Sequence, residues 1–350
     1  MKEIDKSKPV AVTGGTGYIA SWIVKYLLDK GINVKTSVRN KSDRSKYEHL
    51  LKAAENSSAV LTIFEADLLK PGSFDELVKD CELVIHTASP FKIAGVKNFR
   101  KEVIEPALEG TRNVLGSVNR TDSVKRVVLT ASAATIYGDN ADITGKTGGV
   151  FTPDDWNTTS TPDHQPYSYS KTIAEKEAWK ICGEQNRWDL VTIHPGFVLG
   201  PSLTSRTDST SIDFVMSIMK GQFRAGAPQL WFGTVDVRDV ATLHIEAGFN
   251  PSAKGRYIAI EDSYSIPEIT GIVKSKVGSE YPVSSRKVPG FLMYLAGPMM
   301  GFTMKYVKRN LGYKIRFDNS ATIRDFNFKF RPIDETLRDH FEQIKRDQLL

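Results

Sequence analysis

The sequence predicts an α/β protein built on a doubly wound parallel sheet, with a smaller, mixed C-terminal substrate-binding region. Two observations support this prediction. Over the first two hundred of the 350 residues, short apolar runs alternate with longer stretches of helical periodicity, which is the pattern of a parallel sheet covered by helices on both faces. Near the N-terminus, a glycine-rich turn joins the first apolar run to the first helical stretch, as at the start of a βαβ unit.

Short runs rich in apolar or β-branched residues give the expected strands, which are 10–12, 34–38, 60–64, 83–86, 126–130 and 190–193. Helical spacing of apolar residues gives the expected helices, which are 18–30, 99–118 and 167–184. After Pro195 the alternation weakens, and the chain is expected to return to the sheet at 235–247 and 256–259. We therefore expect a dinucleotide-binding domain at 1–195, with returns near 233–260. A substrate-binding region is expected at 196–232 and 261–325. A C-terminal helix is expected at 326–350.

The composition is that of an ordinary globular protein, with a net charge of +6. Lys and Arg look scattered rather than massed, which argues against nucleic acid as a partner. The two cysteines, Cys81 and Cys182, lie far apart and do not form a disulfide framework, so a reducing compartment is expected. Residues 1–8 contain no apolar run typical of a signal peptide, and we expect a cytoplasmic protein.

One apolar stretch, residues 289–307, tests that expectation. A membrane-spanning helix needs about 20 apolar residues in a row. This stretch contains Pro298 and three glycines, and Lys305 interrupts its end. We expect a pair of helices in the core or over the substrate pocket, with no stable membrane insertion. Contact with a membrane surface is the alternative.

The glycine-rich turn follows the first expected strand. Gly14, Gly17 and Ala20 stand three residues apart where that strand gives way to a helix. Gly14 allows the tight turn, Gly17 lets the backbone approach a pyrophosphate, and Ala20 keeps the helix close to the strand. Free N–H groups at the helix N-terminus then face the phosphates. The segment predicts a Rossmann-type dinucleotide site, against the alternative of a purely structural turn. The expected cofactor contacts here are Gly14, Thr16, Gly17, Tyr18 and Ile19.

The end of the second expected strand indicates which dinucleotide binds. An acidic residue there holds the ribose 2′-OH of NAD, whereas Arg accommodates the 2′-phosphate of NADP. This chain has Arg39 at that point, and a guanidinium forms charge-assisted hydrogen bonds with phosphate. We therefore expect NADP(H); the alternative is a solvated surface arginine. Five further residues follow the third and fourth expected strands, where a dinucleotide would lie across the sheet edge. These expected cofactor contacts are Asp67, Leu68, Thr87, Ala88 and Ser89.

Three side chains have the chemistry for reducing a carbonyl group. Tyr167 and Lys171 are four residues apart on an expected helix and so share one face. The ammonium is expected to lower the pKa of the phenol, which makes Tyr167 a usable proton donor. Ser132 ends the fifth expected strand, where its hydroxyl could position a carbonyl oxygen; the alternative is a strand-end cap. Tyr169 points to another side of the helix.

No set of side chains has the spacing of metal ligands, and no metal is expected. His86 and His194 lie at strand ends in apolar runs, and we interpret them as structural. The long polar stretch 139–166 shows little periodicity, and we place it beside the active site.

In these residues the chain resembles the extended short-chain dehydrogenases/reductases, and among them the dihydroflavonol-4-reductase-like and aldehyde (methylglyoxal) reductase subgroup. The resemblance rests on TGGTGYIA at 13–20, on Ser132 and on YSYSK at 167–171. It extends over most of the chain through segments such as EADLLKPGSF, HTASPF, RVVLTASAA, HPGFVLGP and VDVRDVATLHIEA. It implies an NADPH-dependent carbonyl reductase with Ser132, Tyr167 and Lys171 as the catalytic triad. It also implies that Lys171 holds the nicotinamide ribose.

The resemblance implies further contacts for both ligands. Arg39 would bind the 2′-phosphate with Lys46 as the second basic contact. The further cofactor contacts implied are Pro195, Val198 and Ser211. The substrate-pocket residues implied are Phe91, Ser132, Tyr137, Pro166 and Phe197.

One departure from the family pattern concerns the substrate. Plant flavonoid reductases carry Asn five residues after the catalytic Ser, where this chain has Tyr137. This favours smaller or more apolar aldehydes and ketones. The methionine-rich segment 289–304 looks like an adaptable apolar lid that could also admit a sterol-like substrate.

Three other functions remain as alternatives. A sugar-nucleotide epimerase or dehydratase is disfavoured by Ala133, where a dehydratase would need a carboxylate, and by Arg39. An NAD-dependent 3β-hydroxysteroid dehydrogenase is the second. A dinucleotide-sensing regulator without turnover is the third, and the complete set of Ser132, Tyr167 and Lys171 argues against it. The expected partner is a small-molecule carbonyl substrate, and both a monomer and a homodimer stay open.

Overall fold

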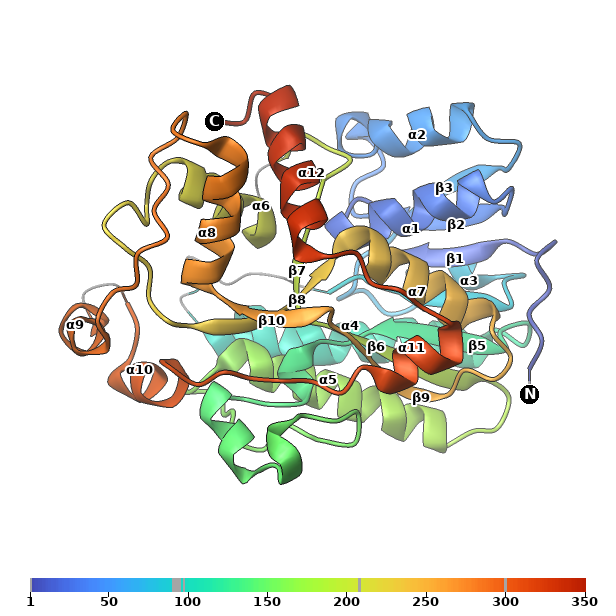
Figure 1. The fold of residues 1–350 in the computed structure, drawn as a ribbon. Coiled ribbons are helices and arrows are strands. Elements are labelled where there is room, and N and C mark those ends of the chain that lie inside the picture. Colours follow the sequence, from blue (N-terminus) through green and yellow to red (C-terminus); the bar gives the residue numbers. More distant parts are fainter. Residues whose placement is uncertain (1, 90–95, 97, 207–208, 299–300) are drawn as a thin grey trace.

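A seven-stranded parallel sheet forms the centre of the molecule (Figure 1). The computed structural model describes residues 2–89, 96, 98–206, 209–298 and 301–350. The strand order is β3-β2-β1-β4-β5-β6-β9, and every neighbouring pair is parallel. The expected doubly wound fold is therefore confirmed. The strands are β1 (Val10–Thr13), β2 (Val34–Val38), β3 (Leu61–Glu65), β4 (Leu83–His86), β5 (Arg126–Thr130), β6 (Asp189–Pro195) and β9 (Gly255–Ala259).

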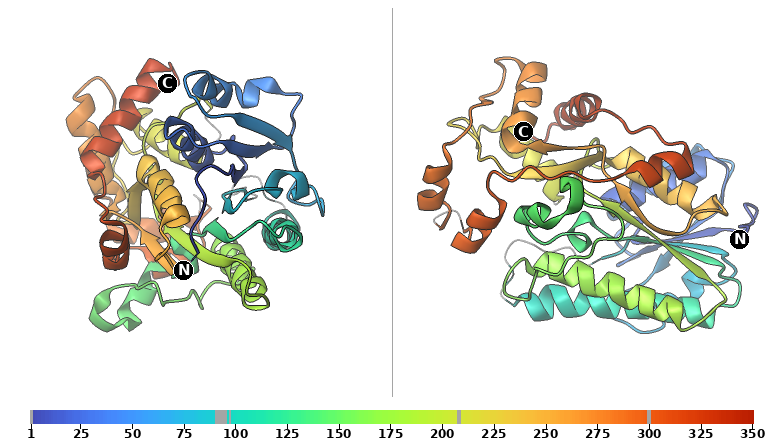
Figure 2. Two further views of the ribbon diagram at one scale, coloured as in Figure 1. Left: turned by 90° about the vertical axis from the view of Figure 1, so that its right-hand side faces the viewer. Right: turned by 60° about the horizontal axis from the view of Figure 1, so that its bottom comes forward.

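Helices cover both faces of this sheet, as Figure 2 shows in two directions. On one face, apolar side chains such as Ile23 and Leu27 pack against the strands in the largest core cluster. On the other face, Val114 and Ala178 belong to a second cluster. The first face carries α1 (Tyr18–Asp29), α2 (Glu48–Glu55), α7 (Val237–Phe249) and α11 (Ser320–Phe326). The second carries α3 (Asp75–Val78), α4 (Glu105–Arg120), which follows a π-helical turn at Arg100–Ile104, and α5 (Pro166–Gly183).

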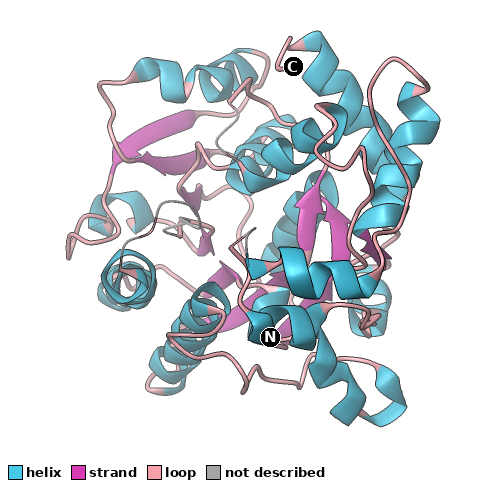
Figure 3. Ribbon diagram, turned by 90° about the vertical axis from the view of Figure 1, so that its left-hand side faces the viewer, coloured by secondary structure: helices cyan, strands magenta, loops and turns pink. Residues whose placement is uncertain are grey.

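A second, three-stranded sheet lies beyond the carboxyl ends of the central strands (Figures 1 and 3). It consists of β7 (Phe197–Leu199), β8 (Trp231–Asp236) and β10 (Asp262–Ser265) in the order β10-β8-β7. Of the expected returns to the central sheet, 256–259 does form a central strand. The return at 235–247 is wrong, since its first two residues end β8 in the smaller sheet and the others belong to helix α7 (Val237–Phe249). A third core cluster joins this sheet to α6 (Thr210–Met219), α8 (Ile266–Val277) and α12 (Ile333–Arg346).

The apolar stretch 289–307 contributes to two short helices, α9 (Gly290–Ala296) and α10 (Met304–Asn310), at the outer edge of the molecule (Figures 1 and 2). The expected helix pair is therefore present. A place in the core is wrong for most of α9, since Phe291 is 66% exposed and Leu295 is 72% exposed, whereas a place over the substrate pocket stays a prediction. Within the described residues, no helix combines the length and the apolarity that crossing a membrane requires.

Candidate active site

The glycine-rich turn lies between β1 and α1, where the strand order reverses and α/β sheets bind ligands. Gly14 has a φ of 70°, and a Cβ there would lie 3.0 Å from the Cβ of Ala88. A Cβ at Gly15 would overlap with the Oγ1 of Thr36 on β2. The turn is also fixed by a 2.8 Å hydrogen bond from the Gly14 N–H to the Oγ of Ser37. The sequence motif of Gly14, Gly17 and Ala20 places no requirement on position 15, whereas the structure requires a glycine there.

The N-terminus of α1 is available to an anion. Gly17 is its exposed N-cap, and no side chain caps the helix. The first N–H groups of a helix have no intrahelical acceptor and attract negative charge. The phenol of Tyr18 donates a hydrogen bond to the Gly200 carbonyl, so its side chain joins α1 to the segment after β7. If Tyr18 contacts the cofactor as expected, it does so through its backbone atoms. Thr16 is half-buried in the turn, and Ile19 packs against the largest core cluster.

Arg39 and Lys46 lie on the surface beyond the carboxyl end of β2. Arg39 is exposed, and no hydrogen bond or ion pair holds its side chain among the described residues. Lys46 ends a 3-10 turn and is also exposed. At the end of β3, Asp67 is exposed, but one carboxylate oxygen accepts a 2.9 Å hydrogen bond from the Leu69 N–H. Leu68 packs closely on α4.

The residues after β4 are fixed to β1 through one hydroxyl that the sequence did not single out. The Oγ1 of Thr13 accepts hydrogen bonds from the N–H groups of Thr87 and Ala88, at 3.1 and 3.0 Å. The same oxygen lies 2.9 Å from the Nδ1 of His86. Burial lowers the pKa of His86 to about 3, so its ring is neutral. The interpretation of His86 as structural is confirmed.

The structure brings Ser132, Tyr167 and Lys171 together. Ser132 precedes a 3-10 turn at Ala133–Thr135, and its Oγ accepts a 3.2 Å hydrogen bond from the Ala134 N–H. The capping role is thus present, but the side chain also forms a hydrogen bond with Tyr167. Pro166 begins α5 and places Tyr167 in its first turn. The Nζ of Lys171 lies 6.0 Å from the centre of the Tyr167 ring.

The pKa of the phenol differs from the expectation. Burial raises the pKa of Tyr167 to about 12, although the hydrogen bond with Ser132 acts in the opposite direction. Burial also lowers the pKa of Lys171 to about 8. The protein groups alone therefore keep Tyr167 protonated, because the free energy of removing a phenolate from water exceeds the stabilisation that the neighbouring groups give it. The ammonium of Lys171 was expected to lower the pKa of Tyr167, and no such effect of Lys171 contributes to its pKa here.

A buried ionic network behind the site was not foreseen from the sequence. The carboxylate of Glu175, one turn after Lys171, accepts a 2.8 Å hydrogen bond from the Nε of Arg256 on β9. Burial alone would raise the pKa of Glu175, but His194 and Arg256 hold it below its usual range. His194 also lies 3.0 Å from the Oγ1 of Thr135, so its structural role is confirmed. The network ties α5 to the turn that carries Ser132.

The long segment after this turn packs beside the site. The N–H of Asn157 donates to the Thr135 carbonyl, and its side-chain amide donates to the Ala134 carbonyl, both at 2.8 Å. Asp139 is buried and accepts a hydrogen bond of 2.8 Å from the Asn310 amide on α10. The placement of 139–166 beside the candidate site is confirmed.

Aromatic side chains dominate the expected substrate side. Tyr137 stacks on Phe151 with ring centres 4.9 Å apart, and Phe317 lies 5.6 Å away. Phe197 on β7 packs edge-on against Phe214, at 5.1 Å. Tyr137 thus belongs to an aromatic cluster, and its contact with a substrate stays a prediction.

The other positions expected from the resemblance are dispersed around these groups. Pro195 is buried at the end of β6, Val198 is half-buried on β7, and Ser211 is buried in α6. Phe91 lies outside the described residues. Among the residues that are described, no group of three or more His, Cys, Asp or Glu side chains could hold a metal ion.

Comparisons with known proteins agree with this geometry. The model of the family described as "NAD dependent epimerase/dehydratase family" matches residues 10–260. A cinnamoyl-CoA reductase of Medicago truncatula is 40% identical over 76% of this chain and 79% of its own length. An anthocyanidin reductase of Vitis vinifera is 38% identical over 77% of this chain and 81% of its own.

Solved structures cover nearly the whole chain. Gre2 from Candida albicans, in complex with NADPH, has a TM-score of 0.79 and 29% identity over 97% of this chain and 99% of its own. The yeast methylglyoxal/isovaleraldehyde reductase Gre2, complexed with NADPH, has a TM-score of 0.77 and 28% identity over 98% and 100%, respectively. The expected resemblance to extended short-chain reductases is confirmed, and the chain is an oxidoreductase that belongs to the NAD dependent epimerase/dehydratase family.

Proposed function

We propose that the chain reduces an aldehyde or ketone to an alcohol with NADPH. The observation that carries the proposal is the meeting of Ser132, Tyr167 and Lys171 beside the glycine-rich turn. Relatives named as reductases and two NADPH complexes of similar fold support the same reaction.

The residues present fit a bound dinucleotide phosphate. The absence of side chains at Gly14 and Gly15 lets the turn pack directly against Ala88 and Thr36, which fixes its backbone at the end of β1. The uncapped N-terminus of α1 offers N–H groups to the pyrophosphate. The exposed Arg39 has its guanidinium free for a 2′-phosphate, with Lys46 as a second cation. When bound, NADPH supplies the hydride for the carbonyl carbon.

The side chains of the chain supply the proton and the positioning. The Ser132 hydroxyl orients the carbonyl oxygen of the substrate. The Tyr167 phenol, which burial keeps protonated, donates its proton to that oxygen. The Lys171 ammonium stabilises the phenolate that remains and holds the nicotinamide ribose. Glu175 takes no part in proton transfer, because its carboxylate is already bound to Arg256.

The substrate we infer is a small or apolar aldehyde or ketone. Two of the residues expected at the pocket, Tyr137 and Phe197, carry aromatic rings that pack in apolar surroundings, which suits an apolar substrate better than a sugar. The test follows NADPH oxidation with small aldehydes, diketones, aryl ketones and flavanonols. Turnover that requires an intact Tyr167 supports the proposal. Turnover of a nucleotide sugar without net NADPH oxidation would favour an epimerase instead.

A further inference from the structure

The positive charge of the chain is concentrated in one segment. Residues 281–317 contain seven Lys and Arg and no Asp or Glu, whereas the rest of the chain has 40 basic and 41 acidic residues. The expectation of scattered basic residues is therefore wrong here. The seven are Arg286, Lys287, Lys305, Lys308, Arg309, Lys314 and Arg316.

Most of this charge is uncompensated. Six of the seven side chains are exposed, and none of the six forms an ion pair among the described residues. Arg309 is the exception, since it pairs with Asp142 and, at 3.3 Å, with Asp139. That pairing fixes α10 to the segment beside the candidate site.

The same segment carries a cluster of exposed apolar side chains. Phe291, Leu292, Tyr294 and Leu295 on α9 are 66, 41, 43 and 72% exposed, and Met304 at the start of α10 is 47% exposed. These five are more than half of the nine large hydrophobic side chains that the described residues expose. Exposed apolar clusters of this kind mark sites of interaction.

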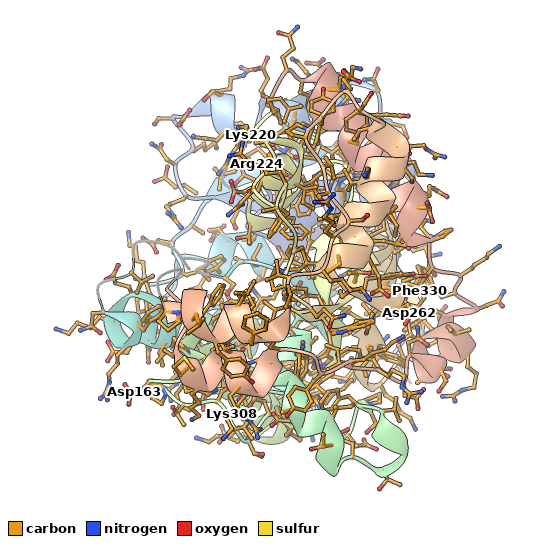
Figure 4. The ribbon with its side chains drawn as sticks, turned by 60° about the vertical axis from the view of Figure 1, so that its left-hand side comes forward. Asp163, Lys220, Arg224, Asp262, Lys308 and Phe330 are labelled. Atoms are coloured by element: carbon orange, nitrogen blue, oxygen red, sulfur yellow. The ribbon has the colours of Figure 1, made fainter. Side chains whose placement is uncertain are left out.

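The two helices present this surface from a fixed base. Met293 and Val307 are buried on the inner side of the pair. The side-chain oxygen of Asn310 accepts a 2.9 Å hydrogen bond from the N–H of Asn140. Figure 4 shows the pair in front, with Lys308 labelled on α10. We call this surface of α9 and α10, with its flanking cations, the basic apolar face.

We propose that the basic apolar face binds the surface of an anionic lipid bilayer. Aromatic and aliphatic side chains next to unpaired Lys and Arg are typical of helices that lie in the headgroup region. The cations would contact lipid phosphates, while Phe291 and Leu295 enter the boundary with the acyl chains. The chain would be held at the surface and would not span the bilayer.

A second copy of the chain fits this face less well. A two-fold interface places the same patch on both subunits, so unpaired cations would face unpaired cations. A nucleic acid would use the charge but not the exposed Leu and Phe side chains on α9. An anionic bilayer satisfies both features at once.

The test is co-sedimentation of the full chain with vesicles of phosphatidylcholine, alone or mixed with phosphatidylserine. We expect binding to the mixed vesicles only, and its loss at high salt. The double substitution Lys305→Glu/Lys308→Glu should weaken this binding at least about tenfold. Phe291→Ser/Leu295→Ser, which keeps the charge, should also weaken it. A charge-matched control, Lys30→Glu/Lys180→Glu at the far ends of α1 and α5, should bind as the wild type does.

Several results would overturn the proposal. They are no binding to mixed vesicles, equal binding to phosphatidylcholine alone, and an equal loss in the control variant. Sedimentation equilibrium provides a further check. A wild-type dimer that Phe291→Ser/Leu295→Ser converts to a monomer would show that the face joins two copies instead. All four substituted side chains of the test variants are exposed, and circular dichroism confirms that the variants fold.

Discussion

The Nζ of Lys171 lies 2.9 Å from the Oγ of Ser89, and this hydrogen bond joins α5 to the segment after β4. The two residues are 82 positions apart in the chain. The contact holds the ammonium between the segment after β4 and the ring of Tyr167, 6.0 Å from the ring centre. In the proposed reaction, Ser89 therefore acts by positioning Lys171 in addition to its expected contact with the cofactor.

The first prediction concerns the proton donor. Tyr167→Phe removes the phenolic hydroxyl and keeps the ring, so only proton donation is lost. We expect kcat/KM for reduction to fall at least about a hundredfold, with an unchanged Kd for NADPH by fluorescence titration. Tyr169→Phe, two residues further on the same helix, is the matched control and should change neither value. The opposite behaviour of the two variants would assign the donor to Tyr169.

The second prediction concerns cofactor choice. Arg39→Ala removes an exposed guanidinium that no other described residue engages, so the fold should be unaffected. We expect NADPH binding to lose about 1.5–3 kcal/mol, the value of a hydrogen bond to a charged group, with little change for NADH. Arg224→Ala, in an exposed turn after α6 (Figure 4), is the control. Equal wild-type affinities for NADPH and NADH would contradict this role of Arg39.

The third prediction is a pH dependence. The pKa of Lys171 is about 8 and that of Tyr167 about 12, so below about pH 8 the pair is ammonium and neutral phenol. As the pH rises, the ammonium loses its proton first, and the phenolate formed by proton donation loses its stabilising charge. We therefore expect kcat/KM for reduction to fall as the pH rises through about 8.

The measurement is a pH profile of the wild type and of Lys171→Arg, whose guanidinium stays charged over this range. If the variant retains activity, the fall near pH 8 should be absent from its profile. Lys176→Arg, on the exposed side of α5, should keep the wild-type profile. A wild-type profile that stays level up to about pH 10 would mean that Lys171 remains charged in the working site.

Local sequence patterns predicted the central sheet well. The strands Val34–Val38, Leu83–His86 and Arg126–Thr130 have the expected bounds. The last two contain continuous apolar runs, as buried parallel strands do, and the first is bounded by Val at both ends. The smaller sheet was missed because the three apolar residues of β7 are too few to show a period, and the four residues of β10 are mostly polar. Helix α9 was expected in the core or over the substrate pocket because apolar runs are usually buried. Its exposure depends on what the fold leaves uncovered, which the local sequence does not show.

The site shows the same division. The roles of Ser132, Tyr167 and Lys171 depend on local spacing and strand ends, which a sequence displays. The contact between Lys171 and Ser89 and that between Glu175 and Arg256 join distant parts of the chain. The pKa of Tyr167 depends on burial, which no local pattern reports.

The fourth prediction tests the tight approach at the glycine-rich turn. A Cβ at Gly15 would overlap with the Thr36 hydroxyl, which donates a 2.8 Å hydrogen bond to the Val12 carbonyl. We expect Gly15→Ala to lower the free energy of unfolding by about 1–3 kcal/mol, the usual cost of overpacking. Gly183→Ala, where no atom lies within 4 Å of the new Cβ, should not destabilise the protein.

Urea unfolding of these variants and of Gly15→Ala/Thr36→Ala checks the cause. If the overlap with Thr36 is responsible, the double variant should be more stable than the sum of the two single changes. Strict additivity would assign the loss to the backbone of the turn.

The last prediction concerns Tyr137 and separates packing from substrate selection. Its stacking on Phe151 means that Tyr137→Ala removes buried aromatic contacts, at a cost of about 3–5 kcal/mol of stability. If one side of the ring also borders the substrate, the variant should gain kcat/KM for larger ketones and lose it for small aldehydes. Phe151→Leu loosens the same cluster through the ring that stacks on Tyr137 and is the control. We expect both variants to lower Tm, but only Tyr137→Ala to change the preference along a substrate-size series. A uniform loss of kcat/KM across all sizes in Tyr137→Ala would show that Tyr137 supports the fold and does not select the substrate.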